Sequence, residues 1–575
     1  MRFRSRSLRG FRAYAVCGVN TVSFALTATD AARHGLLGFC VERSTDNGPF
    51  RWLSGFKVFR SLVPDPSPSD EVSTYTHPIQ ALVWDDFTLA PDTDYTYRFH
   101  PMRGTPAKPR RNQPVSITIH TEPLTGGVHD VVFNRGVASS QAYQHRFSGL
   151  APDRQPTPEL RQAALDWLSR DLDDRLLAFI NSAGAGDRLH GAFYEFSYRP
   201  VLDALVAAAE RGVEVRLVVD AKDAKSSPRD ANNAAIAATG FPPETIIRRD
   251  ARVSAIAHNK FLVLLRGDVP EQVWAGSTNL TIGGIHGQSN VGHLVRDPAT
   301  AAAYSAYWDL LATDPGGHRD DPAALKRSRN ADYLAAVAAL SPAPAERREV
   351  AAGVTPVFSP RPSLGALQLY ARLIGADATS LVCATFAFGI AQEIQDVAAA
   401  GTPDGPLRFF LLETLGKATV RLNASRNVYE AWGSELSHPL GRWVEETTTR
   451  ELRLNKHVAF IHDKFLLCDP LGSDPIVVTG SANFSRASTT DNDENMIIIR
   501  GDRRVADIYF TEFNGLFFHY YFRSVVQSIE DRGGSVDSSS MDLVEDDSWT
   551  AKYAPGTLRA KRVAKLAEMA GTQLS

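Results

Sequence analysis

Two stretches of sequence decide how this chain is organised: HNKFLVLLRGDVPEQVWAGSTN at residues 258–279 and HDKFLLCDPLGSDPIVVTGSAN at residues 462–483. They align without a gap, and in each a glycine follows the histidine by 18 positions (258 to 276, 462 to 480). A single His-x-Lys carries almost no information. A gapless repeat that keeps His, Lys, Ser and Asn indicates an internal duplication with one shared task.

The spacing of these residues predicts a single anion-binding pocket. On a strand, residues i and i+2 face the same side, so His258 projects with Lys260, and His462 with Lys464. If two such strands face each other across a pseudo-twofold axis, two imidazoles and two ammonium groups meet. Lysine and asparagine would stabilise the oxygens of a tetrahedral or trigonal-bipyramidal anion while one imidazole attacks and the other protonates the leaving group. The substrate-binding residues expected from the loops are Ser277, Asn279, Ser481 and Asn483.

This motif resembles the signature of the phospholipase D superfamily, H-x-K-x4-D-x6-G-S-x-N, and the resemblance covers residues 156–530. It implies cleavage of a phosphodiester through a covalent phosphohistidine, without a metal or other cofactor. It also implies that one histidine is the nucleophile and the other the general acid. Members with unequal halves tend to use the N-terminal histidine as nucleophile, so we expect His258 to attack and His462 to protonate.

The two copies are not equivalent. Asp469 fits the aspartate of the motif, whereas Leu265 occupies that position in the first copy. Glu494, 11 positions after Asn483, is a candidate for an acid that orients a histidine, and its counterpart in the first half is Asn290. We therefore expect the two histidines to differ in basicity. The predicted catalytic residues are His258, Lys260, His462, Lys464 and Asp469.

The first part of the chain is predicted to be an all-β sandwich. Residues 1–124 contain short strand-like runs separated by turn residues such as Asp46-Asn47-Gly48. The run FTLAPDTDYTYRFHPM at residues 87–102 resembles the late strands of a fibronectin type III domain. Such a sandwich is commonly a spacer or a module that docks a protein partner. Residues 125–155 lack periodicity and are predicted to be a connector.

Helix and strand patterns then alternate twice, which predicts an α/β fold in two copies. We expect a duplicated phospholipase D-like domain with pseudo-twofold symmetry, formed by residues 156–335 and 354–530 and joined by a hinge at 336–353. Parallel crossovers would cover both faces of each sheet. Residues 531–575 read as an acidic linker and a basic amphipathic helix, which either contacts a membrane or nucleic acid or docks on its own protein.

The composition limits where the protein acts and what it binds. The 575 residues include 62 Lys and Arg against 65 Asp and Glu, so any anion binding depends on a local patch. Four cysteines fit a reducing compartment. The arginine-rich start precedes a stretch that could pass for a signal peptide, but residues 22–27 alternate as a strand does. We expect a cytoplasmic protein, with secretion as the alternative.

Together these features predict a metal-independent phosphodiesterase. The sequence leaves open whether the substrate is a phospholipid or a nucleic acid, and whether the enzyme hydrolyses or transfers. No spaced Cys/His cluster predicts zinc, and no Gly-rich phosphate loop is present. The alternative function is a non-catalytic phosphate-binding or targeting protein whose sandwich docks a partner.

Overall fold

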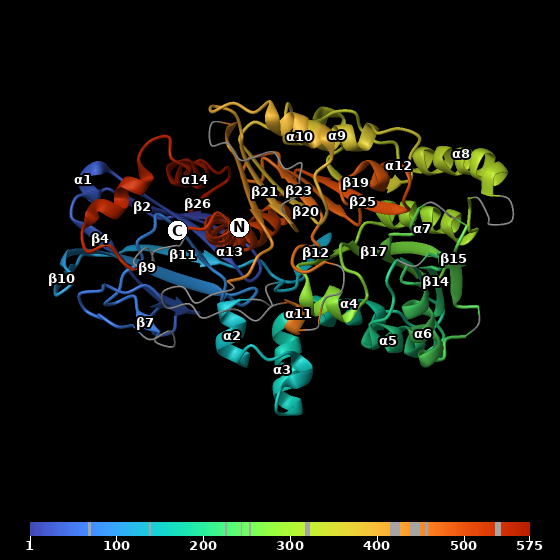
Figure 1. Cartoon of the computed structure of the whole chain (residues 1–575), viewed down its shortest axis with the longest axis horizontal. Helices are drawn as coiled ribbons and strands as arrows, with labels where there is room; N and C mark the ends of the chain where they lie inside the picture. The colour runs from blue at the N-terminus through green and yellow to red at the C-terminus, as the bar shows by residue number, and fades with distance from the viewer. Residues whose placement is uncertain are drawn as a thin grey trace.

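The computed structural model describes the chain except for residues 67–70, 137–139, 225–226, 243, 252–254, 317–321, 415–425, 437–448, 453, 455–457 and 535–541. Three β-rich parts follow one another, the first blue, the second green and the third orange in Figure 1. Within the described residues, no helix combines the length and the apolar character needed to cross a bilayer.

The N-terminal part is a sandwich of two five-stranded sheets, as predicted. Its aromatic core joins them, with Phe24 of one sheet against Tyr97 of the other at 4.7 Å between ring centroids. The Tyr95 hydroxyl accepts a hydrogen bond from the backbone N–H of Ala90, which forms the tyrosine corner found in immunoglobulin-type sandwiches. The first sheet runs β26 (Gln573–Leu574), β1 (Arg2–Arg4), β2 (Phe11–Cys17), β3 (Val22–Ala28), β8 (Val83–Asp86). The second runs β10 (Lys108–Arg111), β9 (Asp94–Thr105), β4 (Leu36–Thr45), β5 (Arg51–Trp52), with β11 (Val115–His120) also on β9.

Two seven-stranded sheets follow, and their strand orders match position by position. The first is β12 (His129–Phe133), β18 (Val291–Val295), β17 (Val269–Gly276), β16 (Lys260–Arg266), β13 (Arg188–Phe193), β14 (Glu214–Asp220), β15 (Ile246–Arg249). The second is β19 (Gly353–Ser359), β25 (Glu494–Arg500), β24 (Ile476–Gly480), β23 (Phe465–Cys468), β20 (Leu381–Phe386), β21 (Leu407–Leu412), β22 (Val428–Trp432). The duplicated α/β fold is therefore confirmed.

The sheets are mixed: the expected parallel pairs are present, and antiparallel strands are added to them. Parallel pairing joins β13, β14 and β15, and likewise β20, β21 and β22. The motif strands β16 and β23 pair antiparallel with their neighbours. The reason is local: each motif strand leads into the next through a short hairpin, and only antiparallel strands can be joined that way.

Helices cover these sheets and link the three parts. Those of the first half are α4 (Leu172–Asn181), α5 (Arg199–Glu210), α6 (Arg229–Thr239), α7 (Pro298–Ala312) and α8 (Pro322–Leu340). Those of the second half are α9 (Gly365–Ile374), α10 (Gln392–Ala399), α12 (Arg486–Thr490) and α13 (Arg503–Glu530). α13 contacts β12, β22 and β2, so one helix touches both halves and the sandwich.

Two boundaries differ from the sequence pattern. β12 lies in the predicted connector but forms the edge of the first α/β sheet. Residues 160–183 have apolar residues at helical spacing, and the structure divides them into two helices, α3 (Pro158–Ser169) and α4, at Arg170, which has a φ of 54° and pairs with Glu512. The tail docks on its own protein, which is one of its two expected alternatives: β26 pairs with β1, and the Trp549 indole donates to the carbonyl of Leu36 at 2.7 Å. The two ends of the chain accordingly lie together in Figure 1.

Candidate functional site

The two motifs meet at the interface between the halves. His258 and His462 end the segments that lead into β16 and β23, and each segment is bridged to the opposite half. The His258 N–H donates to the carbonyl of Asp493 at 2.9 Å, and the His462 N–H donates to the carbonyl of Ser289 at 3.2 Å. Both histidines and both motif lysines are buried. The structure thus brings together the four side chains that the repeat predicted.

Each histidine is oriented by a residue of the other half. The His258 Nδ1 lies 2.9 Å from a carboxylate oxygen of Glu494, and the His462 Nδ1 lies 2.9 Å from the side-chain oxygen of Asn290. Both acceptors fix the proton on Nδ1, which leaves Nε2 as the reactive nitrogen. Glu494 therefore orients a histidine, as its position suggested, but it orients the one in the first half.

The two motif serines act on these orienting residues. The Ser481 hydroxyl donates to Glu494 at 2.6 Å, and the Ser277 hydroxyl donates to Asn290 at 2.8 Å. The expectation that the serines donate to a substrate is therefore corrected, because each hydroxyl proton is already used.

The glycine before each serine has a steric cause. A Cβ on Gly276 would lie 2.2 Å from the carbonyl oxygen of Val291, and one on Gly480 would lie 2.1 Å from that of Asn495. Both glycines also have positive φ, 142° and 155°. Only glycine allows the strands to approach this closely at that φ. The Gly-Ser pair thus builds the wall that holds each orienting residue.

The lysines and asparagines supply the polar surface of the site. Lys260 and Lys464 each donate one proton to the carbonyl of their own histidine, at 2.9 and 2.6 Å, and keep two ammonium protons for other partners. The Asn279 amide donates to Glu195. Among the described residues, the side-chain oxygens of Asn279 and Asn483 are buried without a hydrogen-bond partner.

Burial and mutual repulsion weaken the positive charges of the site. Burial, then Lys260 and Lys464, lower the pKa of both histidines well below their ordinary value. Burial lowers the pKa of Lys260 to about 8, although Glu494 and Glu195 oppose it. Burial likewise raises the pKa of Glu494 to about 8, against the lysines. A bound anion would restore the protonated forms of the basic groups.

Anion binding should therefore weaken above pH 8. Lys260 is charged below its pKa of about 8 and neutral above it, so we expect the affinity for sulfate to fall by up to about tenfold per pH unit above that value. Calorimetric titration with sulfate between pH 6.5 and 9.5 measures this. Lys260→Arg, whose guanidinium stays charged, should flatten the pH dependence. An affinity that is constant across this range in the unaltered protein would contradict the prediction.

Several residues near the site were missed by sequence reasoning. The Tyr194 ring lies edge-on to His258 at 5.0 Å between centroids, and Glu195 accepts from Asn279. Asp220 accepts from the N–H of Ala257 at 3.0 Å, just before the first motif. Glu413 accepts from the N–H groups of residues 459–461, just before the second motif. A signal was present: Asp220 and Glu413 each end or follow a strand at equivalent places in the two halves.

The two walls beside the motif strands differ in polarity. Phe193 pairs with Lys260, and the register of β20 with β23 places Phe386 at the equivalent position opposite Lys464. Two residues further on, the first half has Glu195 and the second has Phe388, whose ring is 51% exposed. One side therefore offers a carboxylate and the other an exposed aromatic ring.

Asp469 is not brought to this site, which corrects its assignment as a catalytic residue. It follows β23 at the end opposite Lys464. Its carboxylate accepts from Arg347 at 2.6 Å, from the Thr379 hydroxyl at 2.8 Å and from the Ser380 N–H at 2.7 Å. Burial by itself would raise the pKa of this carboxyl group, but the hydrogen bonds together have the larger effect, so the pKa is lowered. Asp469 fastens the loop before β20, and its counterpart Leu265 is a buried strand residue.

Replacing Asp469 by alanine should therefore reduce stability and leave catalysis largely intact. Removing one partner of a buried ion pair costs about 3 kcal/mol, which urea unfolding would report. We expect the turnover of a phosphodiester by the folded variant to change less than about threefold. The matched control is Asp268→Asn, because Asp268 is a largely exposed acid in the corresponding turn of the first half. Loss of turnover without loss of stability would restore Asp469 to the catalytic group.

The family model of the cardiolipin synthase, phospholipase D-like domain matches residues 176–311 and 422–517, and each segment contains one motif. No curated protein sequence matches the chain.

Comparison with solved structures gives matches at low identity. Phosphatidylserine synthase of Haemophilus influenzae Rd KW20 is 11% identical, with a TM-score of 0.43, over 69% of this chain and 93% of that one. Polyphosphate kinase of Porphyromonas gingivalis is 12% identical, with a TM-score of 0.37, over 57% of this chain and 46% of that one. Nuc of Salmonella typhimurium, described as a phospholipase D family member, is 25% identical, with a TM-score of 0.21, over 25% of this chain and 87% of that one. Two paired motifs, two matched segments and a duplicated sheet thus make both halves of this chain similar to phospholipase D-like domains.

Proposed function

We propose that the chain is a phosphodiesterase that works through a phosphohistidine. The observation that carries this proposal is the pair of buried histidines whose Nδ1 atoms are both held by acceptors, beside two lysines. The more general activity, chemistry on phosphodiesters, is common in the phospholipase D superfamily, and the covalent route is the more specific part of the proposal. The covalent route is supported by two histidines in one site whose Nδ1 atoms are both held, since one Nε2 can bond to phosphorus while the other transfers the leaving-group proton.

The orienting residues support His258 as the nucleophile. When its Nε2 bonds to phosphorus, the ring gains a positive charge, and the Glu494 carboxylate 2.9 Å from Nδ1 would stabilise that charge. His462 has only the neutral Asn290 amide on Nδ1, which favours release of a proton from Nε2. The phosphorus–oxygen bond to the leaving group breaks, and His462 donates its proton to that oxygen. His462 then takes a proton from water, whose oxygen displaces His258 from phosphorus.

Replacing Glu494 by glutamine tests this division of roles. Glutamine keeps the hydrogen-bonding shape but removes the charge, so we expect kcat to fall about ten- to a hundredfold, the range seen when partners of metal-binding histidines are changed. The matched variant Asn290→Asp places a carboxylate behind His462 instead. It should slow the step in which His462 acts as an acid. An unchanged kcat in Glu494→Gln would argue against a positively charged phosphohistidine at His258.

The test of the function itself is turnover of a bis-aryl phosphodiester, with and without a chelator. Turnover that resists the chelator supports the proposal, and inhibition by the chelator overturns its metal-independent form. Sulfate binding without any turnover would favour the non-catalytic phosphate-binding protein. Phosphatidylcholine vesicles and single-stranded DNA, assayed in parallel and with an alcohol as acceptor, then distinguish lipid from nucleic acid and hydrolysis from transfer.

A further inference from the structure

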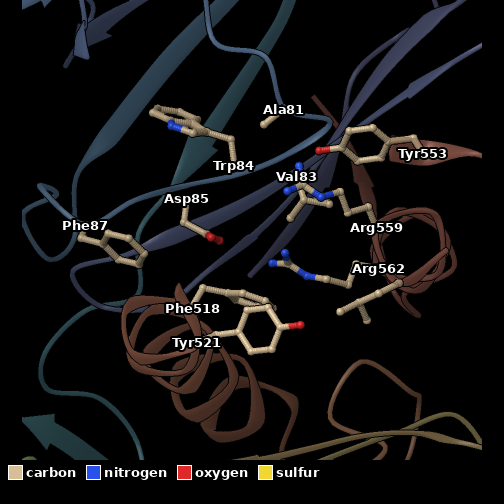
Figure 2. A pocket seen from close by; sticks show the side chains of 11 residues that line it. Ala81, Val83, Trp84, Asp85, Phe87, Phe518, Tyr521, Tyr553, Arg559 and Arg562 are labelled. Atoms are coloured by element: carbon tan, nitrogen blue, oxygen red, sulfur yellow. The ribbon is translucent and has the colours of Figure 1, made fainter. Parts of the chain in front are cut away.

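A second pocket lies between the sandwich, α13 and the C-terminal segment, and it shares no residue with the histidine site. It encloses about 370 Å³ and is drawn in Figure 2. The sandwich contributes β8, α13 contributes Phe518 and Tyr521, and the first turns of α14 (Leu558–Ala567) contribute Arg559 and Arg562. The pocket therefore exists only because the C-terminal segment folds back on the sandwich.

The cationic side of this pocket is poorly satisfied by the protein. The Arg562 guanidinium stacks on the Phe518 ring, 3.4 Å from its centroid, and donates a long hydrogen bond of 3.4 Å to the Asn514 side-chain oxygen. No ion pair to Arg562 or Arg559 occurs among the described residues. Both guanidinium groups point into the same space in Figure 2. Burial lowers the pKa of Arg562 to about 10, although the Asp85 carboxyl opposes this effect.

Aromatic rings and one carboxyl group complete the lining. Tyr553 lies on one side of the two arginines, and Phe518 and Tyr521 lie on the other (Figure 2). Asp85 directs its carboxyl group toward the same space and accepts from the Asn514 amide at 2.7 Å. Asn514 thus stands between Asp85 and Arg562, bonded to both. The lining offers guanidinium donors for an anion, ring faces for a planar group and an acceptor for an amino group.

We propose that this pocket binds a nucleoside monophosphate. Arginine binds phosphate oxygens in a fork geometry, and the positive end of the α14 dipole at Leu558 and Arg559 reinforces that preference. The base would stack on the tyrosine rings, a contact that accepts any base, and its amino group would donate to Asp85. The size of the pocket lies within the range of small-molecule sites.

Calorimetry with adenosine monophosphate, in a buffer free of sulfate and phosphate, tests the proposal in the full chain carrying His258→Ala. We expect binding that weakens at least about tenfold in Arg559→Ala and in Arg562→Gln, and at least about fivefold in Tyr521→Ala. Lys565→Ala, on the same helix but outside the pocket, should bind normally. Arg559 is exposed, so its variant removes the charge without disturbing packing.

Adenosine and glycerol phosphate separate the two halves of the ligand, and both should bind at least about tenfold more weakly than the nucleotide. The proposal is overturned if glycerol phosphate binds as well as the nucleotide, because the rings would then have no role. It is also overturned if both arginine variants bind normally, or if only anionic lipid vesicles bind. Since the protein used carries His258→Ala, this result does not depend on turnover at the histidine site.

Discussion

Replacing His258 by alanine will reduce turnover of a bis-aryl phosphodiester by about 10⁴-fold or more, the scale of nucleophile deletions in hydrolases that use a covalent intermediate. The physical reason is that, of the two motif histidines, only His258 has a carboxylate on its Nδ1. Glu494 holds the Nδ1 proton of His258 and would neutralise the ring once Nε2 is bonded to phosphorus. The measurement is steady-state release of the aryl alcohol.

The control for this variant is His34→Ala, because the His34 side chain is 92% exposed and lies in the sandwich. It should turn over at the normal rate. If His258→Ala keeps the normal free energy of unfolding and more than about a hundredth of the activity, His258 is not the nucleophile. Activity lost in His462→Ala and kept in His258→Ala would assign the nucleophile to the second half.

Replacing His462 by alanine is expected to separate the two chemical steps. An aryl leaving group departs without much help from an acid, so His258 should still become phosphorylated. The second step then lacks the base that activates water, and kcat should fall by about 10²- to 10⁴-fold. A burst of one aryl alcohol per protein molecule should precede the slow phase.

The intermediate itself can be located. A phosphate attached to a histidine is acid-labile, so digestion at neutral pH and mass spectrometry should place it on the peptide that contains His258. The double variant His258→Ala with His462→Ala is the matched control and should give no burst. A burst in His462→Ala with phosphate on another residue would contradict the proposed route, and so would the absence of any burst.

The sequence predicted the parts of this molecule that depend on local pattern. Period-two alternation predicted a strand at residues 22–27, and β3 confirms it. The apolar runs that follow His258 and His462 predicted strands, and β16 and β23 confirm them. The repeat predicted the duplicated α/β fold, because two copies of one pattern fold into two copies of one sheet. The Gly-Ser pair of each motif was visible in the sequence. Its steric reason is that a side chain on the glycine would collide with the neighbouring strand.

Local pattern also predicted wrongly at identifiable places. Residues 129–133 have no turn signals and no amphipathic period, so their pattern predicts a connector. The structure has the edge strand β12 there. Its pairing with β18 joins residues far apart in the chain, and such pairing depends on tertiary context rather than on the strand's own residues. The helix at 160–183 was divided by Arg170, whose left-handed φ is fixed by an ion pair with α13.

What the sequence determined by itself was the inventory: two histidines, two lysines and the strands that present them. What only the tertiary structure decided was which residue serves which histidine. Glu494 orients His258 across 236 positions of chain, while Asp469, five residues after Lys464, fastens a loop at the other end of its strand. The reason is physical. Spacing along a strand fixes which side chains share a face, but contacts between the halves depend on how two sheets pack, and that is set by their buried surfaces together.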